Sequence, residues 1–385
     1  MPAGTATWAE IDLTAIASNV SAIRKHVGQK VEIMAVVKAN AYGHGAVPVA
    51  KAALEAGANR LAVHRSVEGV ELRQAHIEAP ILIMGYTPPD GARTVVRWRL
   101  TPSLIDIEVA RSLSSEAGGI GATVPVHVKV DTGMCRWGLL PGEVVEFIRA
   151  LHNLPHLRLE GIFTHFATAD WEDTEHVLNQ LKVFKGVLND IRHAGYDVPV
   201  VHAANSAATM RLPATHFNAV RIGIAMYGME PSNEWPSAFK IHPALALKSM
   251  VHRVRRLPPG SGISYGRTFI TQQSILAALV PVGYGDGYHR SLSNKGCVLI
   301  RGQRAPIVGR VCMDQCVVDA THIPEVAHDD EVVLIGRQGQ EVISVEEVAR
   351  LAGTINYEVT TSLLPRVSRL YLQKGQIVSA TQLAG

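Results

Sequence analysis

The sequence predicts an α/β protein: a (β/α)₈ barrel of the TIM type in residues 1–240, followed by a mostly β C-terminal domain in residues 241–385. The barrel is predicted by about eight short apolar runs that alternate with amphipathic stretches over roughly the first 225 residues. Such alternation indicates right-handed βαβ units and a parallel sheet. The second domain is predicted by clusters of proline and glycine after about residue 240, which separate short β-rich runs.

The predicted barrel strands are runs rich in Val and Ile that end in a polar or glycine-containing turn. They are residues 31–37, 61–64, 81–85, 101–105, 124–130, 159–164, 198–202 and 219–224. Near-continuous apolar runs of this length are typical of strands that are buried on both faces. About eight of them fit a closed barrel better than an open, doubly wound sheet.

The stretches between these runs carry apolar residues at helical spacing. In the first stretch the intervals are 4, 3 and 4, at Ile16, Val20, Ile23 and Val27. The same rhythm occurs in residues 177–191, and in residues 144–151 after Pro141, which is a favourable residue in a first helical turn. These stretches are therefore predicted to be the helices that cover the barrel.

The predicted C-terminal domain contains hairpins and bulges rather than βαβ units. Its expected strands include residues 275–280, 297–300 and 332–335, which are short apolar runs between glycine-rich turns. The junction between the two domains is expected near residues 231–243.

Composition excludes several classes of protein. With 385 residues, 47% of them hydrophobic, the chain has ample apolar surface for large cores, so disordered and fibrous classes are excluded. The 37 basic and 34 acidic residues leave a net charge of +3, which predicts neither nucleic acid nor a membrane surface as a partner. Four cysteines are too few for a disulfide framework, and there is no secretion signal or apolar membrane span. We therefore expect a soluble, cytoplasmic enzyme.

In an α/β barrel, the residues that follow the carboxyl ends of the strands face the active site. The residues singled out at these positions are Lys38 and Tyr42 after the first strand, Lys129, Asp131, Thr132 and Arg136 after the fifth, His165 after the sixth, His202, Asn205 and Ser206 after the seventh, and Arg221 and Gly223 with the eighth.

Each of these residues also has an ordinary structural interpretation. A lysine at a strand end is usually a solvated rim residue, although Lys38 directly follows an apolar run, where burial can lower its pKa enough for Schiff-base chemistry. By itself, His165 fits a hydrogen-bonded, semi-buried histidine. Ser206 fits either a helix cap or a hydroxyl in a phosphate site. Arg136 and Arg221 fit surface arginines.

Taken together, the set is more informative than its members. Lys38, Tyr42, His165, Ser206 and Arg221 together supply a Schiff-base lysine, a ring to stack, a phosphate anchor and a cation, which suits pyridoxal phosphate (PLP). No metal site is predicted, because HxxxH and HExxH patterns are absent and the 17 histidines are scattered. The glycine-rich residues 283–287 match no nucleotide-binding motif and are interpreted as a tight loop.

Nine motifs, in order along nearly the whole chain, resemble those of the bacterial alanine racemase family. They are AVVKANAYGHG (35–45), KVDTGMCRWG (129–138), EGIFTHFATAD (160–170), HAANSAA (202–208), RIGIAMYG (221–228), SYGRTF (264–269), VGYGDGYHR (282–290), GRVCMDQ (309–315) and INYEVTTSLLPRVSR (355–369). The resemblance implies a PLP-binding barrel followed by a β-domain, a head-to-tail homodimer, and interconversion of L- and D-alanine that supplies D-alanine for peptidoglycan.

The resemblance also implies roles for individual residues. Lys38 would bind PLP covalently, His165 would pack against the pyridine ring, and Arg221 would donate a hydrogen bond to the pyridine nitrogen. The remaining cofactor contacts, mostly to the phosphate, would come from Tyr42, Asn205, Ser206, Gly223, Ile224 and Tyr357. The substrate carboxylate would be bound by Arg136 and Met313, Lys129 is a possible carbamate site, and the entry gate would include Asp170, Tyr284 and Arg290.

Racemisation removes the α-proton from one face of the substrate and returns a proton to the other, so it needs two bases on opposite sides. Lys38 would serve one face and Tyr265 the other, with Tyr265 contributed by the partner subunit. A phenol with a pKa of about 10 needs a nearby cation or donor to act as a base. Cys135 lies where a small residue is common in the family.

Four other functions fit part of the pattern. A decarboxylase of the same fold would pair the pyridine nitrogen with a carboxylate, whereas here the matching residue is Arg221. A racemase for serine or another amino acid stays open, because a methyl or hydroxyl group contributes only about 1–3 kcal/mol to discrimination. A PLP carrier or a Schiff-base aldolase would have no use for Tyr265 in a second domain.

Overall fold

The structure is a computed structural model that describes residues 6–235 and 237–381. It divides into two compact units. The barrel unit comprises residues 16–41 and 46–242, and the β unit comprises the residues up to Ala15, residues 42–45 and the chain from Pro243 onward. This division differs from the predicted one because two segments from the N-terminal part of the chain belong to the β unit.

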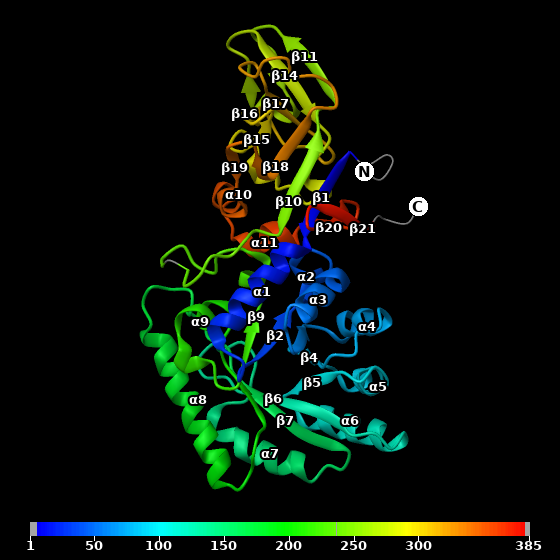
Figure 1. The fold of residues 1–385 in the computed structure, drawn as a ribbon, viewed down its shortest axis with the longest axis vertical. Coiled ribbons are helices and arrows are strands. Elements are labelled where there is room, and N and C mark those ends of the chain that lie inside the picture. Colours follow the sequence, from blue (N-terminus) through cyan, green and yellow to red (C-terminus); the bar gives the residue numbers. More distant parts are fainter. Residues whose placement is uncertain (1–5, 236, 382–385) are drawn as a thin grey trace. The chain divides into compact units, whose positions relative to one another are not determined.

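The barrel unit contains a closed barrel of eight parallel strands, in sequence order around the barrel (Figure 1). The strands are β2 (Glu32–Val36), β3 (Arg60–Val63), β4 (Ile81–Ile83), β5 (Thr101–Leu104), β6 (Val124–Lys129), β7 (Leu157–Phe163), β8 (Val200–His202) and β9 (Ala219–Ile222). Each predicted run contains one of them or overlaps it within a few residues. The predicted fold class is therefore confirmed. Strands with continuous apolar sequence are buried on both faces, so helices are expected to cover the outer side of the barrel.

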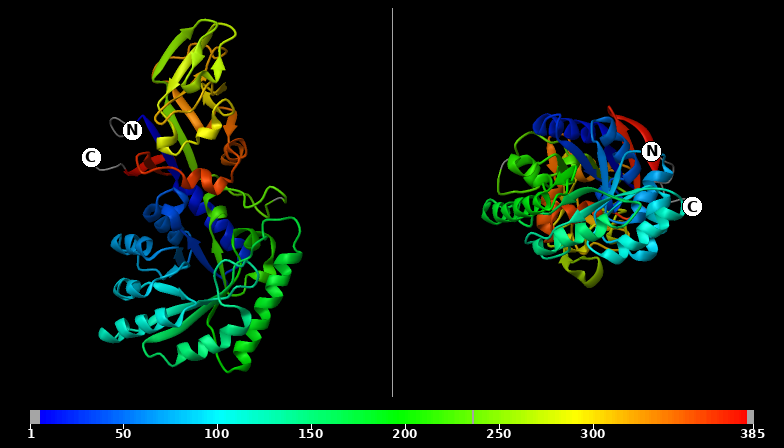
Figure 2. Two further views of the ribbon diagram at one scale, coloured as in Figure 1. Left: turned by 180° about the vertical axis from the view of Figure 1, so that it is seen from behind. Right: turned by 90° about the horizontal axis from the view of Figure 1, so that it is seen from below.

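Eight helices are associated with these strands, and the right-hand view of Figure 2 shows the blue to green helices outside the barrel. They are α1 (Leu13–Val27), α3 (Ala46–Glu55), α4 (Ser66–Gln74), α5 (Ala92–Arg97), α6 (Ile107–Gly119), α7 (Val144–His152), α8 (Glu175–His193) and α9 (Ser206–Arg211). In α1 the residues at helical spacing, Ile16, Val20 and Ile23, are fully buried. Their burial confirms the predicted apolar face. Among the described residues, no helix has both the length and the apolar character needed to cross a membrane.

The β unit is built mainly from antiparallel strands. An eight-stranded sheet has the order β16-β15-β18-β10-β1-β20-β21 with β19 beside β18, a three-stranded sheet has the order β11-β14-β17, and β12 pairs with β13. The elements are β1 (Thr7–Asp12), β10 (Leu245–Met250), β11 (Arg253–Leu257), β12 (Gly262–Ile263), β13 (Phe269–Ile270), β14 (Ile275–Val280), β15 (Cys297–Ile300), β16 (Gln303–Pro306), β17 (Cys316–Asp319), β18 (Glu331–Gln338), β19 (Glu341–Ile343), β20 (Ser368–Gln373), β21 (Gln376–Thr381), α10 (Val345–Ala352) and α11 (Asn356–Thr361). The three strands predicted in this region correspond to β14, β15 and β18.

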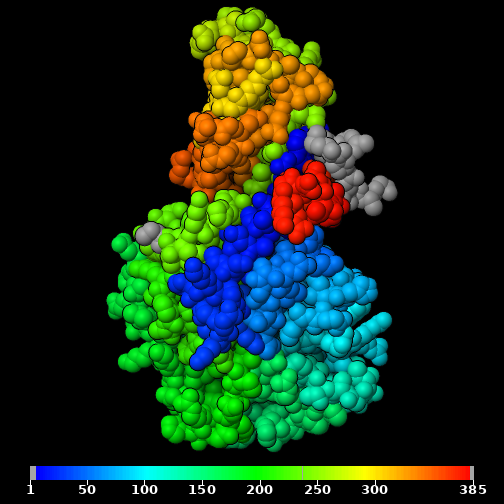
Figure 3. Space-filling model, viewed as in Figure 1, coloured from blue at the N-terminus to red at the C-terminus, as the bar shows by residue number. Residues whose placement is uncertain are grey.

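The first strand of the chain, β1, lies in the sheet of the β unit. It pairs antiparallel with β10 and parallel with β20, so it is a central strand of that sheet. Its residues Thr7 to Ala9 are all buried, and Ala9 and Ile11 are fully buried. At the far edge, β21 is exposed throughout, and its atoms are red at the surface in Figure 3.

Gly43 provides a test of packing within the β unit. Its φ is +84°, and a Cβ atom there would lie 2.0 Å from the carbonyl oxygen of Thr360. We expect Gly43→Ala to lower the free energy of unfolding by about 3 kcal/mol or more, because backbone strain and a backbone clash add together. The matched control is Gly28→Ala, since Gly28 has φ +78° and nothing within 4 Å of its Cβ position. Urea unfolding that shows equal losses for the two variants would contradict the clash.

Candidate functional site

Lys38 begins an unusual backbone turn directly after β2. The segment α2 (Lys38–Tyr42) is left-handed, with φ of 51° to 52° at Ala39, Asn40 and Ala41. L-residues in this region cost roughly 1–2 kcal/mol each, and such strain persists where surrounding contacts enforce it, often at functional sites. One such contact is made by Glu68 on α4, whose Oε1 accepts a hydrogen bond from the Ala39 N–H at 2.6 Å.

The Lys38 side chain is half-buried, and its amine forms no hydrogen bond or ion pair with any residue that the structure describes. Burial lowers the pKa of Lys38, and the charge of Arg136 lowers it further, while Glu68 opposes the shift. A lysine with a lowered pKa has more of the neutral amine, which is the nucleophile in Schiff-base chemistry. The geometry therefore favours the reactive interpretation of Lys38 over that of a solvated rim residue.

Arg221, on β9, is buried and forms several hydrogen bonds inside the barrel. Its NH1 donates to Nδ1 of His202 at 2.8 Å, and its NH2 donates to the carbonyl oxygens of Thr164 and Ala203 at 2.8 and 2.9 Å and lies 3.2 Å from Nδ1 of His165. The Nε–H forms no hydrogen bond with any described residue. Burial lowers the pKa of Arg221 to about 9. The guanidinium thus has a fixed orientation and one N–H left for a ligand.

Ser206 and Gly223 are joined at the mouths of the seventh and eighth barrel strands. The Ser206 Oγ accepts hydrogen bonds from the Gly223 N–H at 2.9 Å and the Ala225 N–H at 3.4 Å. Ser206 is the first residue of α9 and does not cap it; the cap is Asn205, whose Oδ1 accepts from the Ala208 N–H at 3.0 Å. The capping interpretation of Ser206 is therefore wrong, since its hydroxyl contacts the β9 loop, where Ile224 is also buried.

Lys129 lies at the end of β6 and is buried. Its Nζ donates to the carbonyl oxygen of Trp137 at 2.6 Å. Burial lowers the pKa of Lys129 to about 8, and the nearby charge of Arg221 contributes to the shift. A substantial fraction of this amine is therefore neutral near physiological pH.

The loop that carries Arg136 is organised by Asp131. The Asp131 carboxylate accepts hydrogen bonds from the backbone N–H groups of Gly133, Met134, Cys135 and Arg136, at 2.9 to 3.1 Å. Cys135 has a φ of +55° in this loop. Glycine adopts this left-handed region most readily, because it has no Cβ atom. The Arg136 side chain itself is exposed.

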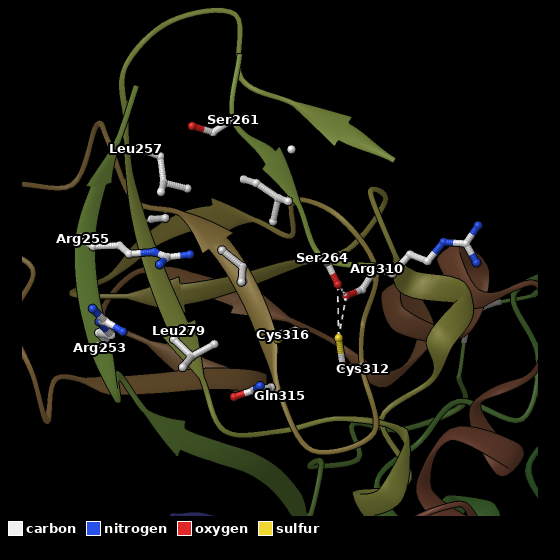
Figure 4. Close-up of a pocket in the computed structure, with 14 residues that line it drawn as sticks. Arg253, Arg255, Leu257, Ser261, Ser264, Leu279, Arg310, Cys312, Gln315 and Cys316 are labelled. Atoms are coloured by element: carbon white, nitrogen blue, oxygen red, sulfur yellow. Dashed lines mark hydrogen bonds between the residues drawn. The ribbon is translucent and has the colours of Figure 1, made fainter. Parts of the chain in front are cut away.

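In the β unit, Tyr265 lies on a strained loop and is 75% exposed. The preceding residue, Ser264, has φ +62°, and its Oγ donates to the carbonyl oxygen of Arg310 at 2.7 Å and lies 3.1 Å from Sγ of Cys312 (Figure 4). Ser264, Arg310 and Cys312 also line a cavity of about 300 Å³ beside β11 and β17. The Tyr265 loop is thus attached to the segment 310–312.

Two other predicted residues lie on loops attached to the same segment. The Tyr284 N–H donates to the carbonyl oxygen of Cys312 at 3.1 Å, and the Gly285 N–H donates to that of Met313 at 2.8 Å. The side chains of Tyr284 and Met313 are 41% and 53% exposed. The Arg290 segment is linked through the hydroxyl of Ser293, which accepts from the Val311 N–H at 3.0 Å. The β unit therefore brings these predicted residues onto neighbouring loops.

The remaining predicted residues occupy simpler positions. The rings of Tyr42 and Tyr357, both in the β unit, lie 6.0 Å apart between centroids, and burial raises the pKa of Tyr42. In the barrel unit, the Asp170 side chain is exposed. His165 is half-buried, and its pKa is well below the usual value, first because of burial and then because of the charge of Arg221.

Three residues near these groups were missed by the sequence analysis as site residues. They are Glu68, His127 and Glu160, which bind neighbouring backbone or side-chain groups through hydrogen bonds. Glu160 lies inside one of the recognised motifs, but a motif does not show what a carboxylate contacts. Only the contacts between strands reveal these roles.

Comparisons with known proteins show which family the chain belongs to. Family models match the chain twice, as the alanine racemase N-terminal domain over residues 11–231 and as the alanine racemase C-terminal domain over residues 244–371. The alanine racemase of Desulforamulus reducens is 48% identical over 367 residues, which is 95% of this chain and 98% of that protein.

Solved structures give the same result. The alanine racemase of Clostridium difficile 630 has a TM-score of 0.95 and 38% identity, over 99% of each chain. The Bacillus anthracis alanine racemase with bound L-Ala-P has a TM-score of 0.94 and 43% identity, also over 99% of each chain. Because the family models and these relatives span nearly the whole chain, the resemblance seen in the sequence is confirmed, and the chain belongs to the alanine racemase family of isomerases.

Proposed function

We propose that this racemase binds PLP through Lys38 and interconverts L- and D-alanine with two bases, Lys38 and Tyr265. The observation that carries the proposal is the pair of unsatisfied groups in one barrel: the Lys38 amine and the Arg221 Nε–H form no hydrogen bond with any described residue. PLP needs both an amine for covalent attachment and a partner for its pyridine nitrogen. When bound, the cofactor withdraws electrons from the substrate Cα and so acidifies the α-proton.

The other barrel residues fit the remaining parts of the cofactor. The Ser206 hydroxyl and the backbone N–H groups of Gly223 and Ile224 are hydrogen-bonding groups suited to a phosphate. The Gly223 N–H, which donates to Ser206 Oγ at 2.9 Å in this structure, would turn to the phosphate when the cofactor binds. His165 is held neutral by burial, so its ring can pack against a pyridine without adding a charge. The phosphate contacts of Tyr42 and Tyr357 and the supporting role of Asn205 follow from the family resemblance.

The chain's own residues handle the proton and the substrate carboxylate. The Lys38 Nζ takes up the α-proton on one face of Cα, and the Tyr265 Oη does so on the other. Tyr265 acts in the partner's site of a homodimer, and its 75% exposure leaves the phenol available for that role. Arg136 and the Met313 N–H bind the carboxylate, while Asp170, Tyr284 and Arg290 line the entry.

Lys129 is proposed as a carbamate site beside Arg136. Carbamate formation requires a neutral amine, and burial lowers the pKa of Lys129 to about 8. The resulting anion would lie at the end of β6, next to the start of the loop that contains Arg136, and a carboxylate-like group is a good partner for a guanidinium. We further propose a cytoplasmic location and a role in supplying D-alanine for peptidoglycan.

The proposed function is tested with purified protein and L-alanine in D₂O. Formation of D-alanine with deuterium at Cα, together with the absorbance of bound PLP, is the expected result. Bound PLP without racemisation of alanine would redirect the proposal to serine or another amino acid. Absence of PLP from protein that folds and has been supplied with the cofactor would refute the proposal.

Replacing Arg221 is expected to change the reaction profile. Arg221→Glu places a carboxylate at the pyridine nitrogen, which favours its protonation and strengthens the ring as an electron sink. We expect racemisation to fall roughly tenfold or more, as for loss of a hydrogen bond from a charged group, while transamination to pyruvate increases. Arg149→Glu, at an exposed position on α7, is the control for a change of charge alone. An unchanged ratio of pyruvate to racemised alanine in Arg221→Glu would contradict the assignment.

A further inference from the structure

Inside the barrel, a row of hydrogen-bonded side chains leads from Arg221 to Glu160. The Arg221 NH1 lies 2.8 Å from His202 Nδ1, His202 Nε2 lies 2.9 Å from His127 Nδ1, and His127 Nε2 lies 3.2 Å from Glu160 Oε2. Arg60 then donates to the same Glu160 oxygen at 3.0 Å. Arg60 is on β3 and Glu160 on β7, which are not neighbours in the closed barrel, so this row crosses the barrel interior.

The direction of every hydrogen bond in the row follows from its two ends. A guanidinium only donates, so His202 Nδ1 must accept, and the ring proton of His202 is on Nε2. That proton is donated to His127 Nδ1, which leaves the His127 proton on Nε2, facing the carboxylate of Glu160. A carboxylate only accepts, so the assignment is consistent from Arg221 to Glu160.

Burial and charge keep the row in this state. His127 is 1% exposed and His202 is 0% exposed, so neither ring can exchange its partner for bulk water. Burial lowers the pKa of both histidines, which keeps them neutral. The hydrogen bond from His127 lowers the pKa of Glu160 to about 2, and the charge of Arg60 contributes, so the carboxylate is ionised at neutral pH.

We propose that Glu160 is a positioning residue for Arg221, acting through His127 and His202. By accepting the Nε2–H of His127, Glu160 stabilises the tautomer that Arg221 requires in both rings and keeps His202 Nδ1 available to Arg221. The inference rests on the proposed function, in which the Arg221 Nε–H contacts the pyridine nitrogen of PLP.

Loss of the Glu160 carboxylate would reverse the direction of the hydrogen bonds in the row. Without Glu160, the buried His127 Nε2–H has no acceptor, and the Arg60 guanidinium that contacted the same carboxylate oxygen can only donate. These two donors at one end of the row oppose the preference of Arg221 at the other end and drive the His127 proton to Nδ1. His127 Nδ1–H then faces His202 Nε2, which must become an acceptor, so the proton of His202 moves to Nδ1. Arg221 NH1 then meets an N–H instead of a lone pair, and the guanidinium loses the contact that orients it.

Three variants separate this role from a structural one. Glu160→Met removes the acceptor and the charge, whereas Glu160→Gln removes the charge and keeps an amide oxygen for His127. Glu32→Met is the matched control, because Glu32 also pairs with Arg60, at 2.5 Å, but forms no hydrogen bond to either histidine among the described residues. The readouts are the ¹⁵N NMR shifts of the imidazole nitrogens in PLP-loaded protein with labelled histidines, and kcat and KM for alanine.

We expect the Nε2–H tautomer in both His127 and His202 of the wild-type protein and of the Gln and Glu32→Met variants. In Glu160→Met we expect the Nδ1–H tautomer and a kcat lower by roughly tenfold, as for loss of a hydrogen bond to a charged group, with KM nearly unchanged. Recovery of most of kcat in Glu160→Gln would support the acceptor role.

Three outcomes would overturn the inference. They are an Nδ1–H tautomer in either wild-type ring, an unchanged tautomer in Glu160→Met, or an equal fall of kcat in Glu32→Met. If Glu160→Met does not fold, the wild-type spectrum and the Gln variant still decide the question. A wild-type protein that neither binds PLP nor racemises alanine would refute the proposed function, while the tautomers in its spectrum would still show whether Glu160 orders the row.

Discussion

Lys38→Ala is expected to abolish racemisation of alanine, with a loss of at least about 10³-fold, because the variant lacks both the covalent attachment point for PLP and one of the two bases. The physical basis is a half-buried amine with a lowered pKa at the end of a barrel strand. In D₂O, neither D-alanine nor deuterium at Cα should form from L-alanine. The absorbance of covalently bound PLP should also be lost.

The matched control is Lys51→Ala, since Lys51 is an exposed lysine on α3 in the same unit. We expect this variant to keep full activity and normal PLP absorbance. That result would show that the loss in Lys38→Ala is not a general effect of removing a lysine. Retention of more than a tenth of the wild-type rate by folded Lys38→Ala would contradict the assignment of Lys38.

Tyr265→Phe is expected to reduce racemisation by about 10²–10⁴-fold, the usual contribution of a general acid or base. The substitution removes only the phenol oxygen, so the loop geometry with Ser264 attached to Arg310 stays the same. Exchange of the α-proton should persist for the one enantiomer whose proton faces Lys38. Measuring Cα deuteration separately for L- and D-alanine therefore tests the two-base mechanism. Equal loss of exchange from both enantiomers would argue against it. Tyr86→Phe, at an exposed tyrosine of the barrel unit, is the control.

Mixed dimers test whether Tyr265 acts in the partner's site. Lys38→Ala and Tyr265→Phe chains, each inactive alone, are refolded or co-expressed together. If Tyr265 is contributed across the dimer, each heterodimer has one site with both an intact Lys38 and an intact Tyr265, and about a quarter of the wild-type activity should return on random mixing. If Tyr265 acts within its own chain, every site lacks one base and no activity returns.

Much of the fold followed from local pattern. The eight runs rich in Val and Ile became the barrel strands because strands covered on both faces need continuous apolar sequence. The helical spacing of Ile16, Val20 and Ile23 likewise predicted the buried face of α1, because both observations depend on residues only a few positions apart. The candidate lysine and arginine were found by the same reasoning, since the ends of barrel strands meet at one mouth.

Other features depended on residues far apart in the chain. The placement of β1 in the β unit required β10 and β20, which come more than two hundred residues later, because a strand shows its apolar pattern but not its partners. The contact of Ser206 with the β9 loop likewise depended on where the chain returned.

The row from Arg221 to Glu160 is the clearest case of this dependence. A histidine or glutamate in a strand has the same local pattern whether it faces solvent or a partner across a barrel. Four strands had to close before His127, His202 and Glu160 could exclude water and complete each other's hydrogen bonds. The residue types that the chemistry needs can be read directly from the sequence. Their ionisation states and tautomers are set by burial, which arises only when distant segments pack together.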